Sequence, residues 1–338
     1  MRQVKAAVIG LGWMGSHYAH IAAQAHNAQL VAVCDHHSEE KTHGIATELG
    51  VEGYTDARTM FQEHKDLEAA IIVTPEPAHF DPMCAAVEAG VHILLEKPVA
   101  TVMSEAREIV RMCRAAGLTL SVCHHLRFDP RYAAVHDAVA AGEVGDVVHL
   151  YARRNLPTWS PQHLSGRVEV TFWTGVHDID MMNWIVGQRV VRVTARGRMN
   201  VLKDLGVHDV IVSILEYADG TLAVLENSWA TPSLQGRPRA YVLDVRGTKG
   251  AAEVAGYETG AQLYTETAAR PLDTYYRMNL NGTWIGPYRD LTVHFFDAIL
   301  AGHAPLITGE DGLASTLVAD AIVRSLASGR TEAVEWDD

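Results

Sequence analysis

The sequence is poor in cysteine, in positive charge and in long apolar runs. Only four cysteines occur among 338 residues, none of them beyond residue 123 and none in a C-x-x-C pair. Their neighbours are mostly apolar, a pattern that indicates reduced, half-buried thiols. A disulfide framework is therefore excluded as the basis of the fold.

The charge balance is acidic. Lys and Arg total 28 against 41 for Asp and Glu, which gives a net charge of −13. The densest basic cluster is Arg153-Arg154, too short to form a patch that would attract a phosphate backbone. We therefore expect no nucleic-acid partner.

No stretch approaches the roughly 18 uninterrupted apolar residues that a membrane helix needs. The first apolar run follows Arg2 and Lys5, as in a signal peptide, but Gly10, Gly12 and Gly15 break it. No small-residue cleavage site follows. These features predict a cytoplasmic protein without membrane attachment.

The composition that remains is that of an ordinary globular protein, with 48% hydrophobic and 20% charged residues. At 338 residues the chain is about twice the usual domain size, which predicts two domains. We place them at residues 1–123 and 124–338.

In residues 1–123, short apolar runs alternate with helical segments of about 10–15 residues. Such alternation predicts an α/β domain with a doubly wound parallel sheet. The expected strands are 4–9, 30–34, 69–73, 92–95 and 118–122, and the expected helices are 14–26, 38–50, 79–89 and 104–116.

Residues 124–338 follow a different pattern, with longer strands of partly alternating polarity. Asp219-Gly220 indicates a tight hairpin, and Asp129-Pro130 indicates a helix start. We expect an α+β domain with a large, mostly antiparallel open sheet. Its strands would be 146–154, 190–199, 207–217, 221–230 and 239–246, and its helices 130–141, 176–186, 288–301 and 310–328.

The segment Gly10-Leu11-Gly12-Trp13-Met14-Gly15 is a G-x-G-x-x-G motif between a predicted strand and a predicted helix. Its first glycine permits a tight turn, the second lets backbone approach a pyrophosphate, and the third permits close helix–strand packing. The helix N-terminus adds N–H groups and a positive dipole. The motif therefore predicts a dinucleotide site of the Rossmann type.

Asp35 lies twenty residues after Gly15, at the end of the second predicted strand. A carboxylate there binds the ribose hydroxyls and repels a 2′-phosphate, so NAD is favoured over NADP. Protonated His36 and His37 would weaken that discrimination.

Glu96-Lys97-Pro98 ends the strand predicted at 92–95, at the sheet edge where ligands bind. A lysine there can donate to a substrate hydroxyl or exchange a proton with it. Taken alone, Lys97 would be assigned more simply as a solvated surface residue.

A set of motifs along the chain favours a functional role for Lys97 instead. The chain resembles the glucose-fructose oxidoreductase/inositol dehydrogenase/rhizopine-catabolism (Gfo/Idh/MocA) family. The resemblance implies a nicotinamide-dependent oxidoreductase of sugars, cyclitols or their derivatives, with an open C-terminal sheet that often forms oligomer interfaces. The motifs are GLGWMG (10–15), TPEPAH (74–79), EKP (96–98), RFDPRY (127–132) and GVHDIDMMNWIVG (175–187).

By the same resemblance, Lys97 is the catalytic lysine and His177 the general acid–base residue, with substrate between them. Asp180, three residues later in the same helix, would orient the imidazole. The remaining expected contacts are on the cofactor side, where Thr74, Pro75 and His79 line the cleft and Glu96 holds the nicotinamide end.

Two positions depart from the family pattern. Trp173 stands where many members have Asp, and it offers an apolar face for a sugar ring or simply a packing residue. His125 stands where many have Asn, and would add a titratable group near Lys97. Arg154, and Trp159 in the irregular loop 156–170, are further substrate candidates, although a surface role is favoured for Arg154 taken singly.

Several alternatives stay open. A metal bound by His124, His125, His177, Asp178 and Asp180 is disfavoured, because adjacent histidines continuing a strand point to opposite faces. Within the family, a sugar-nucleotide or keto-sugar reductase, or an enzyme that cleaves glycosides by transient oxidation, also fits. A nucleotide-sensing regulator would not need Lys97 and His177. We expect a homodimer or homotetramer.

Overall fold

The computed structural model describes residues 2–231, 240–255, 262–264, 269–271 and 278–336. They form two compact units. The first comprises Met1–Phe128 with Tyr275–Leu313, and the second Asp129–Thr274 with Ala314–Asp338. Residues 278–313 thus belong with the N-terminal part of the chain, although nothing in their periodicity indicates this.

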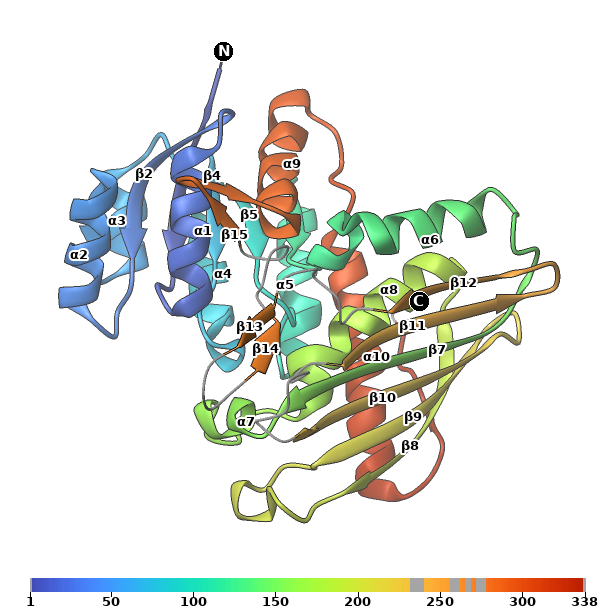
Figure 1. The fold of residues 1–338 in the computed structure, drawn as a ribbon. Helices are drawn as coiled ribbons and strands as arrows, with labels where there is room; N and C mark the ends of the chain where they lie inside the picture. Colours follow the sequence, from blue (N-terminus) through green and yellow to red (C-terminus); the bar gives the residue numbers. More distant parts are fainter. Residues whose placement is uncertain (1, 232–239, 256–261, 265–268, 272–277, 337–338) are drawn as a thin grey trace. The chain divides into compact units, whose positions relative to one another are not determined.

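The first unit is built on a six-stranded sheet in the order β3-β2-β1-β4-β5-β6, and every strand pair is parallel. The order reverses between β1 and β4, which confirms the doubly wound sheet (Figure 1). The strands are β1 (Val4–Ile9), β2 (Ala28–Cys34), β3 (Glu52–Tyr54), β4 (Ala69–Ile72), β5 (His92–Leu95) and β6 (Leu120–Val122).

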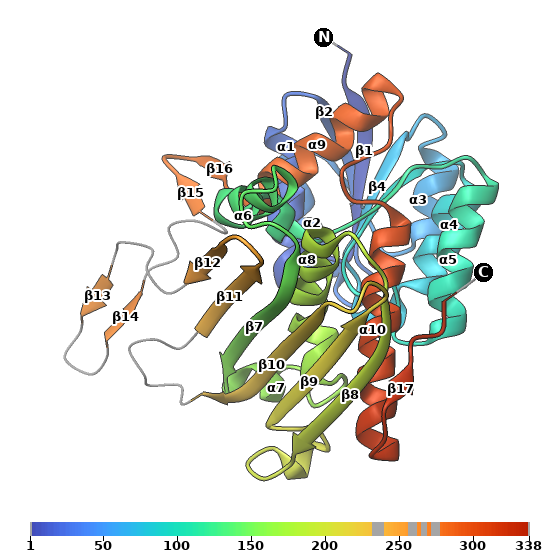
Figure 2. The same ribbon diagram turned by 90° about the vertical axis from the view of Figure 1, so that its right-hand side faces the viewer.

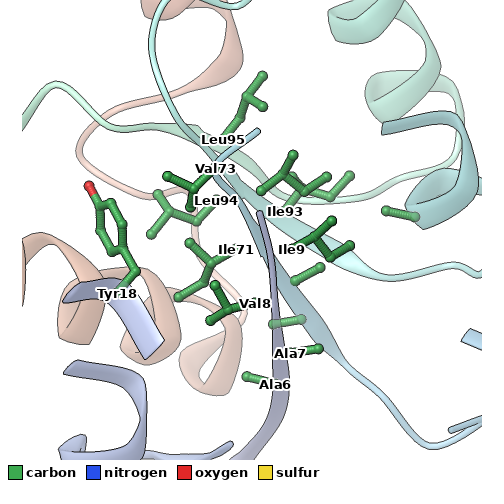
Figure 3. Close-up of a cluster of buried hydrophobic side chains, with 14 of the residues drawn as sticks. Ala6, Ala7, Val8, Ile9, Tyr18, Ile71, Val73, Ile93, Leu94 and Leu95 are labelled. Atoms are coloured by element: carbon green, nitrogen blue, oxygen red, sulfur yellow. The ribbon is translucent and has the colours of Figure 1, made fainter. Parts of the chain in front are cut away.

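The strands are almost wholly apolar because helices cover both faces of the sheet. Side chains such as Val8, Ile71 and Leu94 are fully buried, and Tyr18 from α1 lies beside them (Figure 3). The helices are α1 (Trp13–Gln24), α2 (Glu39–Leu49), α3 (Ala57–Glu63), η1 (Glu76–Ala78), α4 (Phe80–Glu88), α5 (Met103–Ala115) and η2 (His125–Phe128).

Local signals explain most of these boundaries. The Ser38 hydroxyl accepts the Lys41 N–H at the start of α2, and Gly50 ends that helix in the left-handed region. The short β3 and α3 are absent from the sequence prediction. Asp56 caps α3 by accepting the Thr59 N–H, but the two elements together are too short for a clear period.

The late segment completes the first unit through β15 (Met278–Leu280), β16 (Thr283–Ile285) and α9 (Pro287–Ala301). The Asn27 amide donates to the Val293 carbonyl at 2.8 Å and to Asp297 Oδ1 at 2.7 Å. Gly312, in the first turn of α10 (Gly309–Ser328), lies so close to Val122 that a Cβ would be 2.4 Å from it.

The second unit contains a seven-stranded sheet in the order β12-β11-β7-β10-β9-β8-β17 (Figure 2). Only β7 and β10 pair in parallel, so the expected, mostly antiparallel sheet is confirmed. The strands are β7 (Val147–Pro157), β8 (Val190–Arg198), β9 (Val210–Tyr217), β10 (Leu222–Thr231), β11 (Ala240–Gly247), β12 (Ala251–Ala255) and β17 (Glu332–Ala333).

Helices cover one face of this sheet, and the other face carries partly exposed side chains such as Val212, Ile214 and Leu222. Besides α10, the helices are α6 (Pro130–Ala140), α7 (Trp159–His163), η3 (Thr171–Gly175), α8 (Val176–Val186) and η4 (Lys203–Leu205). A separate strand pair joins β13 (Gln262–Tyr264) to β14 (Ala269–Pro271). Within the described ranges, no helix is long and apolar enough to span a membrane.

Candidate active site

The register of the first sheet brings the predicted cofactor residues to one edge. Ile9 pairs with Cys34 on one side and with Ile72 on the other, Ile72 pairs with Leu95, and Leu95 with Val122. The residues that follow, from Gly10 to Lys97, therefore all leave the sheet at its carboxyl edge. The ends of β1 and β5 are two strand spacings, or about 10 Å, apart.

The three glycines of the motif are required for different reasons. Gly10 has a φ of +89°, and a Cβ there would lie 2.7 Å from the Val73 carbonyl group. A Cβ on Gly15 would lie only 1.7 Å from the Gly10 carbonyl oxygen, because α1 starts directly against the turn. Gly12 has no atom within 4 Å of a Cβ position, so its backbone faces open space.

The start of α1 fits a pyrophosphate. Gly12 is its N-cap and makes no side-chain capping hydrogen bond, and a helix N-terminus favours an anion through its dipole. Leu11 is buried, whereas the Trp13 side chain is 60% exposed. Trp13 contacts the His17 ring edge-on at 5.2 Å. Leu11, Trp13 and Met14 can thus contact a dinucleotide mainly through backbone and the Trp13 ring.

Asp35 lies directly after β2, and its carboxylate holds the glycine turn after β1 in place by a hydrogen bond. Its Oδ2 accepts the Leu11 N–H at 2.6 Å, and its Oδ1 accepts the His37 N–H at 2.9 Å. Each carboxylate oxygen keeps a lone pair for a further donor, so a ribose diol can still bind. The exposed His36 and His37 rings contact each other in a tilted arrangement, with their centres 3.7 Å apart.

The loop after β4 contains the predicted cleft residues Thr74, Pro75 and His79. Thr74 is half-buried and Pro75 is exposed. His79 is only 1% exposed, and its ring nitrogens lie 3.0 Å from the Thr74 carbonyl oxygen and 3.2 Å from that of Val99. Burial lowers its pKa. The prediction that His79 lines the cofactor cleft stays a prediction, and the buried ring connects the loop after β4 with the segment that contains Val99.

Glu96 and Lys97 follow β5 and are both buried, with Lys97 9% exposed. The Lys97 N–H donates to Glu96 Oε2 at 2.6 Å, so this carboxylate shapes the turn that carries the lysine. The assignment of Lys97 to a solvated surface position is wrong. Burial and the nearby Cys123 and Glu96 raise the pKa of Tyr18 well above its usual value.

His125 belongs to η2 and is buried, stacked on Tyr288 of α9 with ring centres 4.1 Å apart. The strand placement assumed for His124 and His125 is wrong, because β6 ends at Val122. Among the residues that the structure describes, no group of three or more His, Cys, Asp or Glu side chains could hold a metal ion.

The sequence does not predict an ion pair between the buried Arg127 and the half-buried Asp311. Arg127 Nη2 lies 3.0 Å from Asp311 Oδ1, and Arg127 Nη1 donates to the Leu306 carbonyl at 3.2 Å. Asp311 Oδ2 also accepts the Thr308 N–H at the start of α10. Arg127 of the RFDPRY segment thus contacts Asp311 at the start of α10, which joins two segments that lie far apart in the sequence.

In the second unit, the first two turns of α8 carry His177, Asp178 and Asp180. His177 is 7% exposed, and both carboxylates are more deeply buried. The helix continues from the π-helical turn η3, whose Gly175 lies against Asn227 of β10. A Cβ on Gly175 would lie 2.3 Å from Asn227 Oδ1, so α8 starts at a fixed distance from the sheet. Such π-turns are frequent at functional sites.

Trp173 belongs to η3, one helical turn before His177. Its ring is half-buried and lies 5.9 Å from the Arg167 guanidinium. It is the least buried side chain of that turn, as a residue that contacts a ligand should be. Trp159 begins α7, but its side chain lies outside the described part of the structure.

Arg154 is not on the surface, which corrects the surface assignment. Its side chain is buried, and Nε and Nη2 donate to the two oxygens of Asp178 at 2.7 and 2.8 Å. Its guanidinium also lies 4.2 Å from the centre of the Tyr241 ring. The alternation of β7 contained this signal, because Leu150, Ala152 and Leu156 have the same parity as Arg154.

Comparisons with known proteins decide the family. Residues 4–124 match the model of an oxidoreductase family with an NAD-binding Rossmann fold, and residues 132–253 match the GFO/IDH/MocA C-terminal domain. The chain belongs to the Gfo/Idh/MocA family. It is an NAD-dependent oxidoreductase.

Individual relatives cover the whole chain. It is 30% identical to an inositol 2-dehydrogenase of Rhizobium meliloti (97% of this chain, 98% of the relative). It is 27% identical to a 2,7-anhydro-N-acetylneuraminate hydratase of Mediterraneibacter gnavus (96% and 95%). The fold matches a scyllo-inositol dehydrogenase of Lactobacillus casei, solved with NAD(H) and scyllo-inositol, at a TM-score of 0.83 and 22% identity over 98% and 99% of the two chains.

Proposed function

We propose that this family member oxidises a secondary alcohol of a cyclitol, sugar or sugar derivative, with Lys97 and His177 as its catalytic residues. The observation that carries the proposal is Lys97 at the carboxyl edge of the parallel sheet, on a turn shaped by Glu96. The relatives named inositol 2-dehydrogenase support the substrate class.

Bound NAD supplies the hydride acceptor. The N–H groups at the start of α1 hold its pyrophosphate, Asp35 its ribose, and Thr74, Pro75 and Glu96 the remaining cleft. Lys97 donates a hydrogen bond to the reacting oxygen and stabilises negative charge on it, while the neutral imidazole of His177 accepts the hydroxyl proton. Trp173 stacks on the ring of the substrate, and His125 and Trp159 complete the proposed set of substrate residues, whereas Arg154 is bonded to Asp178.

The test is turnover with NAD on a panel of inositols, aldoses, amino sugars and anhydrosugars. Lys97→Ala and His177→Ala should each lower kcat by about 10²–10⁴-fold, while NAD binds with unchanged affinity. Near-normal kcat in both variants would remove these assignments. Absence of turnover on the whole panel, with NAD still bound, would instead favour a nucleotide-sensing regulator.

A second candidate comes from the relative named as a hydratase. An enzyme that oxidises its substrate, eliminates or adds a group and then reduces it again uses NAD without consuming it. Such an enzyme gives product without net NADH, whereas the dehydrogenase gives a steady rise in absorbance. A sugar-nucleotide or keto-sugar reductase would run faster with NADH and a ketone.

We further propose a cytoplasmic homodimer or homotetramer. The partly exposed Val212, Ile214 and Leu222 on the outer face of the second sheet support self-association. Light scattering would test it, and a monomer at micromolar concentration would exclude it.

A further inference from the structure

A row of side chains on the inner face of the second sheet supports the start of α8. In the register of the sheet, Arg154 lies directly opposite Tyr241 of β11 on one side and Asn227 of β10 on the other. Asn227 contacts Gly175, just before α8, and Arg154 contacts Asp178, in its first turn. Gly175 precedes His177 in the sequence and Asp178 follows it, and both of these residues contact the sheet.

The Arg154–Asp178 contact is bidentate and shielded from water. Both side chains are at least 95% buried. Burial disfavours the charge on Arg154, but Asp178 and Tyr132 raise its pKa well above its usual value. The Tyr241 ring adds a cation–π contact. Two full charges are thus held against each other, and Asp178 presents little net charge to its neighbours.

This neutralisation matters for the residue next to Asp178. A carboxylate close to an imidazole favours its protonated form and raises its pKa by about one unit or more. In the first turns of α8, His177 directly precedes Asp178 and lies three residues before Asp180, so both carboxylates are its neighbours in the helix. An imidazole that is already protonated cannot accept a proton from an alcohol.

We propose that Arg154 is a positioning residue that pairs with Asp178, fixes the first turn of α8 and keeps His177 neutral at physiological pH. The importance for catalysis rests on the proposed role of His177 as the base. Arg154 is then assigned to this pair rather than to direct contact with substrate. Asp180 remains as the carboxylate that favours one orientation of the imidazole.

Other titratable groups lie on the elements packed around α8. On β10, Glu226 lies on the outer face, where it accepts from Tyr151 and Asn155. Before η3, Glu169 pairs with His208. On β9, Tyr217 donates to Asn183 of α8. Within α6 and its cap, Asp129 pairs with Arg131 and Asp137 with His136. The remaining titratable residues on α6 and β7 are Tyr132, His149, Arg153 and Arg154.

The test measures the pKa of the His177 imidazole by NMR of the full-length enzyme with NAD bound and its histidine rings labelled with ¹³C. The His177 signal is assigned by its loss in His177→Gln. Arg154→Met leaves Asp178 unpaired and should raise the pKa by about one unit, whereas Asp178→Asn leaves Arg154 unpaired and should lower it by about as much. The double variant should return it to within about 0.3 unit of the wild-type value.

Arg154→Lys retains the charge and should leave the pKa near its wild-type value. Arg153→Met removes an arginine from the opposite face of the same strand and should also change nothing. If Arg154→Met does not fold, as judged by circular dichroism, Asp178→Asn and the double variant still decide the matter. Shifts in the same direction for both single variants, or shifts below about 0.3 unit, would overturn the proposal.

This measurement needs no turnover, so it separates two failures. Loss of the expected pKa shifts refutes the role of Arg154, whatever the activity. Opposite shifts in the two single variants, with His177→Ala still active, would keep Arg154 as the residue that controls the His177 pKa but would refute His177 as the base.

Discussion

The two units place their polar groups by different means. In the first unit, Asp35, Gly10 and Lys97 each follow the end of a parallel strand, and strand register alone brings them to one edge. In the second unit, Arg154 and Asp178 lie inside the layer between sheet and helix, held by each other. The comparison shows that one site depends on backbone position and the other on side-chain pairing, so different substitutions should damage each.

The largest effect should come from the glycine turn. Gly15→Ala places a Cβ 1.7 Å from the Gly10 carbonyl oxygen, which requires α1 to move. We expect a loss of at least about 3 kcal/mol in the free energy of unfolding, measured in urea, and loss of NAD binding. Gly12→Ala is the matched control for stability, since nothing obstructs its Cβ. It should unfold within about 0.5 kcal/mol of wild type yet bind NAD at least about tenfold more weakly. Equal stability of both variants would contradict the backbone account.

Asp35 lies at the same edge of the first sheet, and its substitution should have a smaller effect than that of Gly15. Asp35→Ala removes the charge that repels a 2′-phosphate, along with the acceptors for Leu11 and His37 N–H. The preference for NAD over NADP, measured as the ratio of dissociation constants by calorimetry, should fall about 10–100-fold, or ~1.4–2.7 kcal/mol. Asp35→Asn keeps one acceptor oxygen and should distort the turn less. An unchanged ratio in both variants would mean that another group selects the cofactor.

The helix caps compare the units directly. Ser38 caps α2 in the first unit at an exposed position, and Asp129 caps α6 in the second while buried and paired with Arg131. Ser38→Ala should cost about 1 kcal/mol of unfolding free energy, and Asp129→Ala about 2 kcal/mol. Asp129→Asn, which keeps the capping oxygen, should recover part of the loss. A larger cost at Ser38 would reverse the comparison.

The smallest effect concerns pH. Burial lowers the pKa of His79 below 6.5, so the unfolded chain binds more protons than the folded one just below that pH. The stability contributed by neutral His79 is therefore complete above about pH 6.5 and falls as the pH drops toward the folded pKa. Between pH 6.5 and 5.5, wild type should lose more stability than His79→Gln in urea unfolding, by up to about 1 kcal/mol. Parallel pH dependences would show that His79 does not contribute.

The parallel sheet of the first unit could be predicted from sequence except for the short β3, because its other strands, caps and glycines are local signals. Ser38 and Gly50 act as expected there, and so does Asp129 at the start of the second unit. What could not be predicted were contacts between distant segments. Arg127 with Asp311 joins residues 184 positions apart, and no periodicity encodes such a pair. The position of Arg154 is partly predictable. The alternation along β7 indicates that its side chain is buried, but it does not identify Asp178 as the partner.

The return of residues 278–313 to the first unit has a consequence for synthesis. Asn27 bonds to α9, and the tight contact of Gly312 with Val122 closes the packing around β6. A ribosome that has made the first 128 residues must add 185 more, up to residue 313, before these contacts can form. At about 5–20 residues per second, that is a delay of roughly 10–40 s. The first unit is thus begun before the second but is completed only at residue 313, after most of the second unit has been made, so its nascent sheet must persist without these contacts until then.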